Sequence, residues 1–127
     1  MERTLAECRA RGWKPGVVER RVPRMNITID LYSIIDVVVL DDRPGCLGLQ
    51  VTDSTSHSKH RDKLMVDKAA ESMSWLAAGN RLQIWSFGKR GDRGKRKTWT
   101  LRCEAILLDP EFGLASRELE PHEIEEE

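Results

Sequence analysis

One carboxylate lies inside an apolar, β-branched run of the chain, at position Asp36 within residues 34–40. Burying an ionised carboxylate among isoleucines and valines costs several kcal/mol unless the charge is paired, hydrogen-bonded or bound to a metal. The next apolar run ends in the polar–apolar–polar triplet Gln50-Val51-Thr52. Because carboxylate and amide oxygens are ligands of hard cations, an acid on one strand beside a strand with a polar end predicts a divalent cation site.

Other roles for the same residues stay open. Asp36 can also be a structural acid that caps a turn or pairs with an arginine from the preceding segment, because structural pairs bury acids too. The arginines in that segment are Arg20, Arg21 and Arg24. For Gln50 and Thr52, the alternative is an ordinary solvent-facing end of a strand.

The spacing of apolar residues predicts an alternation of helices and strands. Helical periodicity predicts a short helix over 2–11, which ends at Gly12, and a main helix over 61–78, which ends at Gly79-Asn80. Alternating or continuous apolar runs predict strands over 17–22, 27–29, 34–40, 47–51, 82–87 and 99–108. This order of elements predicts an α/β fold with a mixed sheet packed against helices.

With this order, the segments around Asp36 and Gln50-Val51-Thr52 resemble the PD-(D/E)XK nuclease superfamily, which includes Holliday-junction resolvases. The resemblance spans residues 2–87 and implies a restriction-endonuclease-like αβββαβ core, with a mixed central sheet flanked by helices. In that family, an acid on one central strand and an acid-X-lysine triplet on the next hold Mg²⁺ at the scissile phosphate. Asp36 matches the first acid, Gln50 the second and Thr52 the lysine, which makes a D…QxT variant of the motif.

Two of these three positions depart from the family pattern. Gln50 offers a neutral carbonyl oxygen as a ligand, and Thr52 carries no positive charge. In the family the lysine can migrate to the following helix, where this chain has Lys59 and Lys63. Acids from elsewhere in the chain would complete the metal shell, and the candidates are Glu7, Glu19 and Asp30.

The resemblance implies a Mg²⁺- or Mn²⁺-dependent DNA endonuclease of the junction-resolvase type that acts on branched or structured DNA. It also implies a homodimer, because two symmetric cuts require two sites. One alternative is a catalytically inactive nuclease-fold module that binds nucleic acid or a protein. A second alternative is a regulator whose acidic C-terminal segment contacts a basic partner.

The formal charge of zero hides an uneven distribution of charged residues. Residues 109–127 hold eight acids and one base, which leaves 20 bases against 13 acids, a formal +7, on residues 1–108. A basic body favours polyanions, nucleic acid first. We expect a single nuclease-like domain over 1–110 and an acidic, flexible tail over 111–127.

Two basic segments are predicted to bind nucleic acid. The loop over 88–97 carries six bases against one acid, which favours an arm that contacts phosphates, although a solvated hairpin tip is the alternative. Its bases are Lys89, Arg90, Arg93, Lys95, Arg96 and Lys97. The start of the main helix, with His57, His60 and Arg61, is predicted to face phosphates, because helix N-termini attract anions. The alternative there is a metal site shared by the two histidines.

The composition also bears on the compartment. No apolar run approaches the roughly 20 residues that span a bilayer, and the N-terminal residues lack the order of a signal peptide. Three cysteines without CxxC spacing predict free thiols in a reducing compartment. We therefore expect no membrane partner and a location in the cytoplasm of a bacterial, archaeal or phage-infected host cell.

Overall fold

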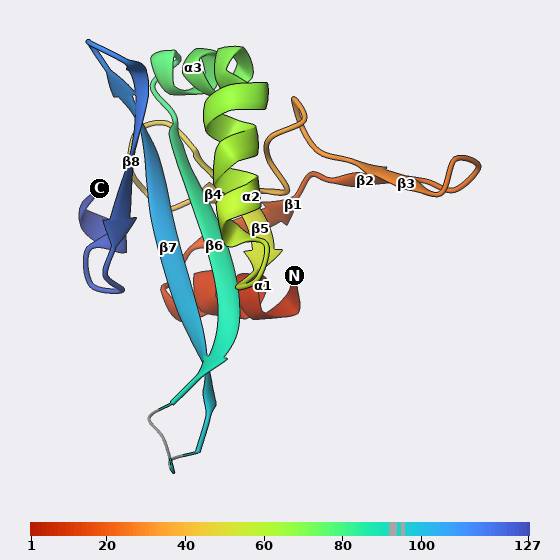
Figure 1. The fold of residues 1–127 in the computed structure, drawn as a ribbon, viewed down its shortest axis with the longest axis vertical. Coiled ribbons are helices and arrows are strands. Elements are labelled where there is room, and N and C mark those ends of the chain that lie inside the picture. The colour runs from red at the N-terminus through yellow and green to blue at the C-terminus, as the bar shows by residue number, and fades with distance from the viewer. Residues whose placement is uncertain (92–93, 95) are drawn as a thin grey trace.

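The computed structural model describes residues 1–91, 94 and 96–127, and has a six-stranded mixed sheet with helices on both faces (Figure 1). The helical elements are α1 (Glu2–Ala10), α2 (His57–Asp62), the π-helical turn η1 (Lys63–Asp67), α3 (Ala69–Ala77) and the 3-10 turn η2 (Ile124–Glu126). The strands are β1 (Lys14–Val17), β2 (Arg20–Val22), β3 (Ile27–Ile29), β4 (Val37–Leu40), β5 (Leu47–Asp53), β6 (Arg81–Arg90), β7 (Thr98–Asp109) and β8 (Gly113–Leu119). The predicted mixed α/β class is confirmed.

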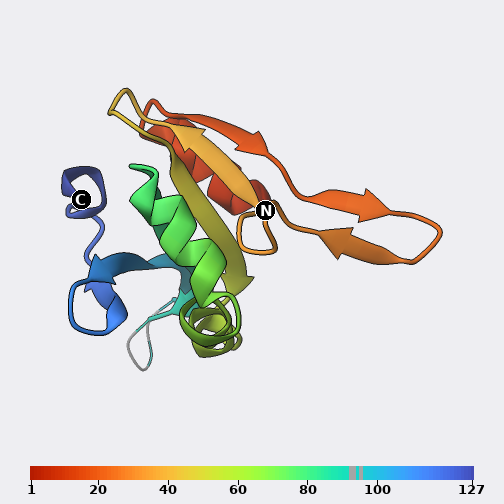
Figure 2. The ribbon, with the colours of Figure 1, turned by 90° about the horizontal axis from the view of Figure 1, so that it is seen from above.

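The main sheet has the strand order β1-β4-β5-β6-β7-β8. Strands β1, β4 and β5 form one antiparallel meander, and β6, β7 and β8 form another. The two halves meet at the parallel pair β5–β6, in which Gln50 lies opposite Ile84. A parallel pair requires a crossover connection, and α2, η1 and α3 provide it (Figure 2).

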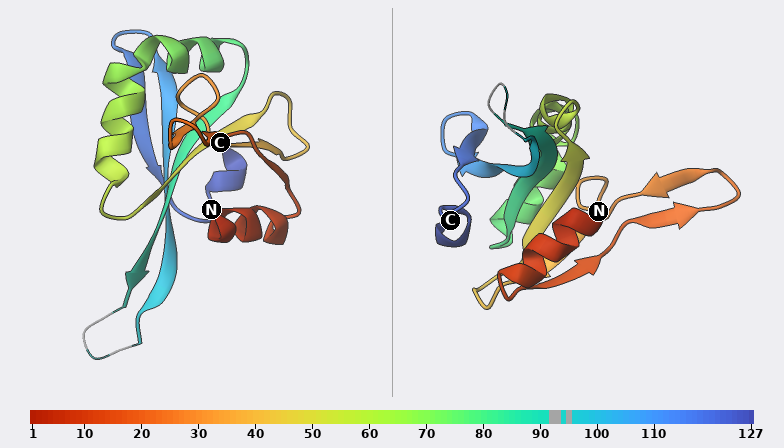
Figure 3. Two further views of the ribbon diagram at one scale, coloured as in Figure 1. Left: turned by 90° about the vertical axis from the view of Figure 1, so that its right-hand side faces the viewer. Right: turned by 90° about the horizontal axis from the view of Figure 1, so that it is seen from below.

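Each face of the sheet is covered by a different helical layer (Figure 3). Helix α1 and the turn η2 cover one face, where Cys8 and Trp85 belong to the buried core. The crossover helices cover the other face, where Leu64 and Ile84 are buried together. Strand β6 is buried on both faces because its alternating side chains enter both cores. None of the helices in the described part of the chain combines the length and the apolar character that a membrane crossing requires.

The apolar run over 34–40 is not the continuous strand that its pattern predicts. Only residues 37–40 form β4, and residues 30–36 make a tight reversal of the chain before it. Ile34 and Ile35 are nevertheless fully buried, because they pack into the core under the crossover helices. The apolar pattern therefore predicted the burial of this run correctly, but it predicted strand structure correctly only for residues 37–40.

The predicted strand over 17–22 is divided between two sheets. Strand β1 ends at Val17 in the main sheet, whereas β2 pairs with β3 in a separate two-stranded sheet. We call residues 20–29 the β2–β3 arm. The arm projects from the body on one side, and the β6–β7 hairpin extends past the sheet in another direction (Figure 1, right and bottom).

Residues 113–119 form strand β8 where the acidic composition predicts a flexible tail. Strand β8 pairs with β7, and Leu114 and Leu119 on it are buried. Glu118 accepts a hydrogen bond from Arg102 on β7, and Ile124 beyond the strand is fully buried. Three apolar residues thus anchor this segment, the side chain of Glu127 accepts a hydrogen bond from Gln83, and the sheet extends to residue 119.

Gly45 lets the β4–β5 turn touch the end of α3. Its φ is +78°, and an added Cβ would lie 2.1 Å from the carbonyl oxygen of Gly79. We expect Gly45→Ala to lower the free energy of unfolding by about 1–2 kcal/mol for the left-handed conformation and by about 1–3 kcal/mol more for the clash. Urea denaturation measures the loss.

Gly12→Ala is the matched control for this prediction. Gly12 has a φ of +79°, but an added Cβ there meets nothing within 4 Å, so its loss should be confined to the conformational part. Equal losses in the two variants would contradict the close approach of Gly45 to Gly79.

Candidate metal centre

A tight reversal over residues 30–36 brings two aspartates together. Leu31 donates a backbone hydrogen bond to Ile35 and accepts one in return, at 2.9 and 3.1 Å. The two residues at the tip, Tyr32 and Ser33, have φ of 53° and 64°. Positive φ at both central positions is the geometry of a type I′ turn, which normally selects glycine or asparagine. Here Tyr32 and Ser33 adopt the left-handed conformation instead, and Asp30 and Asp36 lie at the two ends of the reversal.

Three carboxylates converge at the base of this reversal. Glu19, Asp30 and Asp36 each place an oxygen so that all three oxygens lie within 4.8 Å of one another. Glu19 reaches the cluster because its backbone N–H, like that of Val18, bonds the carbonyl oxygen of Asp36. A set of oxygen ligands at this spacing can hold a hard divalent cation.

Gln50 and Lys63 complete the surroundings of the cluster. The Gln50 amide Nε2 donates to Asp36 Oδ2 at 2.7 Å, and the backbone N–H of Val51 donates to the same oxygen at 2.7 Å. Gln50 Oε1 accepts from Lys63 Nζ at 3.3 Å, and Lys63 Nζ also lies 3.2 Å from Asp30 Oδ2. The carbonyl of Gln50 therefore faces the lysine, and its amide faces the acid, which differs from the predicted carbonyl ligand.

Lys63 stands where the crossover helix changes its winding. It is the first residue of the π-helical turn η1, which is closed by a hydrogen bond of 2.7 Å from the Lys68 N–H to the Lys63 carbonyl. The buried hydroxyl of Ser72 donates to the carbonyl of Leu64 at 2.8 Å and so satisfies a group inside the turn. Single π-helical turns within helices often lie at functional sites, and this one carries the lysine of the cluster.

The two aspartates of the cluster have opposite pKa shifts. Burial, together with the neighbouring Asp30, raises the pKa of Asp36 to about 7. Burial opposes ionisation of Asp30 as well, but hydrogen bonds from Asp36 and Lys63 outweigh it, so the pKa of Asp30 lies below its ordinary value. Like charges this close do not both ionise readily, and the pair keeps a proton near neutral pH.

A cleft connects the cluster with solvent. Its volume is about 380 Å³, and it leads from Asp36 to the base of the β6–β7 hairpin. Its lining residues are Met1, Arg3, Glu19, Asp36, Val51, Thr52, Asp53, Phe87 and Trp99. The guanidinium of Arg3 lies 3.7 Å above the ring centre of Trp99, so a cation and an exposed aromatic face share the far end. Two of the three carboxylates, a cation and an aromatic ring thus line a single cleft.

Several predicted site residues meet here and others do not. Those that meet are Asp36, Gln50, Glu19, Asp30 and Lys63, with Thr52 lining the cleft. Glu7 does not join them, because it pairs with Arg11 one helical turn away at 3.1 Å. Lys59 lines a separate cleft of about 250 Å³ that also contains Lys63. Of the two predicted lysines, the contacts with the cluster belong to Lys63.

The predicted nucleic-acid-binding residues are also divided. Lys89, Arg90, Arg96 and Lys97 are exposed on the β6–β7 hairpin, whereas Arg93 and Lys95 lie outside the described residues. At the start of α2, His57 does not face a phosphate as expected, because it is fully buried. His60 is half-buried beside Lys59, and Arg61 donates to Glu104 at 3.3 Å.

His57 is the centre of a buried chain of hydrogen bonds. Its Nδ1 lies 2.6 Å from Ser86 Oγ, and its Nε2 lies 2.9 Å from Glu104 Oε1. The order serine, histidine, carboxylate is that of a hydrolase triad, but Ser86 is 0 % exposed and has no access to a substrate. These hydrogen bonds instead connect the start of α2 to β6 and β7. Sequence reasoning missed them because the three residues come from distant elements.

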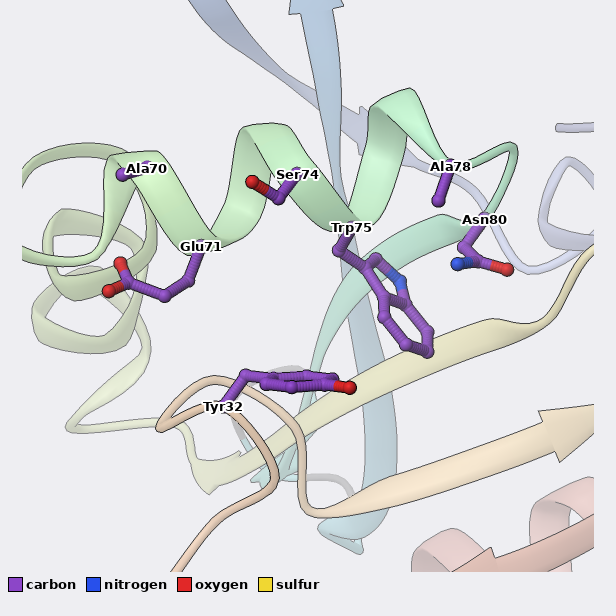
Figure 4. Close-up of a pocket in the computed structure, with 7 residues that line it drawn as sticks. All are labelled: Tyr32, Ala70, Glu71, Ser74, Trp75, Ala78 and Asn80. Carbon is purple, nitrogen blue, oxygen red and sulfur yellow. The ribbon is translucent and has the colours of Figure 1, made fainter.

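A second cleft lies on the far side of the residue 30–36 reversal (Figure 4). It has a volume of about 510 Å³ between Tyr32 and helix α3, with Trp75 and Asn80 also in its wall. Glu71 is the one carboxylate among the described residues that line it. The larger cleft thus lacks a cluster of acids, whereas Glu19 and Asp36 of the carboxylate cluster line the smaller one.

No family model, curated protein or solved structure matches this chain.

The shared proton of the aspartate pair is open to direct measurement. In chelator, we expect the carboxyl carbon of Asp36 to titrate with a midpoint near 7 by NMR. Asp30→Asn should lower this pKa part of the way toward its ordinary value, because a negative neighbour is removed while burial remains. Glu118→Gln, far along the sheet, is the control and should leave it unchanged. An ordinary midpoint for Asp36 in the wild type would contradict the packed geometry.

The buried His57 chain predicts a pH-dependent contribution to stability. Burial lowers the pKa of His57, so the unfolded chain takes up the proton first as the pH falls. The stability contributed by neutral His57 is therefore complete above the unfolded pKa of about 6.5 and declines below it. We expect His57→Gln to lower the free energy of unfolding by about 1–3 kcal/mol at pH 7.5.

The difference between wild type and His57→Gln should shrink between pH 6.5 and 5, as measured by urea denaturation. The raised pKa of Asp36 makes the protein less stable as the pH rises, which is opposite to the effect of His57. Both proteins contain Asp36, so its contribution cancels in the difference between them. The exposed His122 provides the control variant His122→Gln, for which no loss is expected. A difference that stays constant with pH would show that His57 does not titrate as its burial predicts.

Proposed function

We propose that the protein is a divalent-cation-dependent nuclease that hydrolyses phosphodiester bonds in DNA. The observation that carries the proposal is the convergence of Glu19, Asp30 and Asp36, whose oxygens lie within 4.8 Å of one another beside an open cleft. Oxygen ligands favour Mg²⁺ or Mn²⁺ over softer metals. The cleft leads toward a hairpin rich in lysine and arginine, which suits a polyanionic substrate.

The charge balance of the cluster supports a cation at this place. Three carboxylates surround a partly buried space that holds one lysine, and the pKa of Asp36 is raised to about 7 by burial and by Asp30. A divalent cation would compensate the excess negative charge and replace the retained proton. The donor set therefore fits a hard cation.

Each residue of the cluster has a distinct part in the proposed reaction. Glu19, Asp30 and Asp36 would hold the cation, which when bound would supply Lewis-acid polarisation of a phosphoryl oxygen and acidify a bound water. Lys63, 3.2 Å from Asp30, would stabilise the negative charge that develops on the phosphate. Gln50 orients both Asp36 and Lys63 through the two ends of its amide. The lysine expected at Thr52 is thus supplied from the crossover helix.

The order of elements also supports the proposal. Helix α1, the meander β1-β4-β5, the crossover helices and the parallel strand β6 follow the αβββαβ order of the PD-(D/E)XK resemblance, with the β2–β3 arm inserted after the first strand. From the same resemblance we propose branched or structured DNA as the substrate. A homodimer belongs to this proposal, since paired cuts in a symmetric junction need two sites.

A second candidate is a nuclease-fold protein that binds DNA without cutting it. Gln50 favours this alternative, because a neutral amide donor lies 2.7 Å from Asp36 where the family pattern places a second acid. An amide hydrogen bond already satisfies part of the negative charge that a cation would otherwise balance.

Incubation with a labelled four-way junction and with a linear duplex, in Mg²⁺, Mn²⁺ or chelator, tests the proposal. We expect cleavage with either metal and none in chelator. Asp36→Asn should reduce the rate at least about 100-fold and weaken Mn²⁺ binding in calorimetry, because a ligand is lost. Lys63→Met should reduce the rate by about 10²–10³ and leave Mn²⁺ binding in place.

Lys59→Met is the matched control, because it removes an equal charge from the same helical segment away from the carboxylates. It should retain most of the cleavage rate. Circular dichroism and thermal unfolding identify any variant that fails to fold. If the protein binds the junction but cleaves it with neither metal, the nuclease proposal is wrong and the protein that binds DNA without cutting it is favoured.

A further inference from the structure

The β2–β3 arm has few means of stability within its own chain. Its two strands of three residues pair only with each other among the described strands. An isolated two-stranded hairpin is marginally stable in water at best. Large apolar side chains are nevertheless exposed on it: Met25 is 67 % exposed, Ile27 42 % and Ile29 39 %. A projecting element that exposes several large apolar side chains is typical of a surface that binds a partner.

The charge of the arm identifies the kind of partner. The arm carries Arg20, Arg21 and Arg24 and no acid over residues 20–29. Two copies of it would repel each other, whereas a polyanion would be attracted. Arg21 contacts Asn26 across the turn, so Arg20 and Arg24 are the arginines left to reach outward.

The base of the arm is part of the candidate metal centre. Glu19 directly precedes β2, and Asp30 directly follows β3. Both belong to the cluster of three carboxylates, so the cluster closes the arm at its root. Whatever the arm binds is therefore held next to the site at which cleavage would occur.

We propose that the β2–β3 arm enters the major groove of duplex DNA, an inference that rests on the proposed action on DNA. Paired strands lie about 4.8 Å apart, and a two-stranded ribbon fits a major groove about 12 Å wide but not a minor groove about 6 Å wide. Arg20 and Arg24 contact phosphates along the groove. The exposed Met25 at the tip packs against base edges and sugars inside it.

Binding measured in chelator separates this inference from catalysis. A fluorescein-labelled duplex is titrated with wild type and with the double variant Arg20→Gln, Arg24→Gln over a range of salt concentrations. We expect the variant to bind more weakly and to depend less steeply on salt. The magnitude of the slope of log affinity against log salt should decrease by about 2, because each lost phosphate contact reduces that magnitude by about 0.9. The double variant Arg9→Gln, Arg117→Gln removes the same charge from exposed positions on α1 and β8 and should keep the slope.

Chemical footprinting assigns the groove. Dimethyl sulfate methylates guanine N7 in the major groove and adenine N3 in the minor groove. Wild type should protect guanine N7, and Met25→Ser together with the arginine changes should remove that protection. An unchanged salt slope in a folded arm variant, or protection that persists without the arm's side chains, would overturn the inference. Sedimentation that shows a dimer which Met25→Ser dissociates would do the same, because the arm would then serve a second copy of the chain.

The outcomes for the two proposals are distinguishable. A protein that binds through the arm but never cleaves contradicts only the nuclease. A protein that cleaves while the arm variants bind as wild type contradicts only the groove-binding role.

Discussion

The close approach of Asp30 and Asp36 is the constraint on which the rest of the site depends. Two carboxylates share a partly buried space, and one of them keeps a proton near neutral pH because burial and its neighbour oppose its ionisation. Such an arrangement is unfavourable by itself, and it persists because surrounding groups hold it. Gln50, the Val51 N–H and Lys63 each stabilise one part of the pair.

Features that look independent are connected through this pair. The left-handed turn at Tyr32 and Ser33 sets the spacing of the two acids, and the buried side chains of Ile34 and Ile35 hold that turn against the core. The π-helical turn directs Lys63 to them from the opposite layer. Strain in the backbone and irregular helix winding therefore occur at the same place as the unusual proton.

Sequence reasoning anticipated which polar residues meet better than it anticipated the elements that carry them. Asp36 was predictable because an acid in an apolar run must find a partner. Gln50 was predictable as the polar end of the next run, and Lys63 followed only from the family resemblance. The reversal before β4 was not, since neither residue at its tip is a glycine or asparagine that announces a turn. Strand β8 was not predicted because the acidic composition was judged over the whole segment. What places the strand in the sheet is the burial of two single residues, Leu114 and Leu119. The buried His57 chain joins distant residues, which a single sequence does not pair.

The charged residues of strand β8 have a consequence for self-association. Open sheet edges expose unpaired backbone groups that can recruit a strand from another molecule. At one edge of this sheet β8 presents Arg117 and Glu118 to solvent, and at the other edge β1 contains Pro15, which has no N–H to offer. Both margins therefore resist growth of the sheet by addition of further chains. Any pairing of two molecules must be sought on the helical faces or the protrusions, and aggregation by strand addition is discouraged.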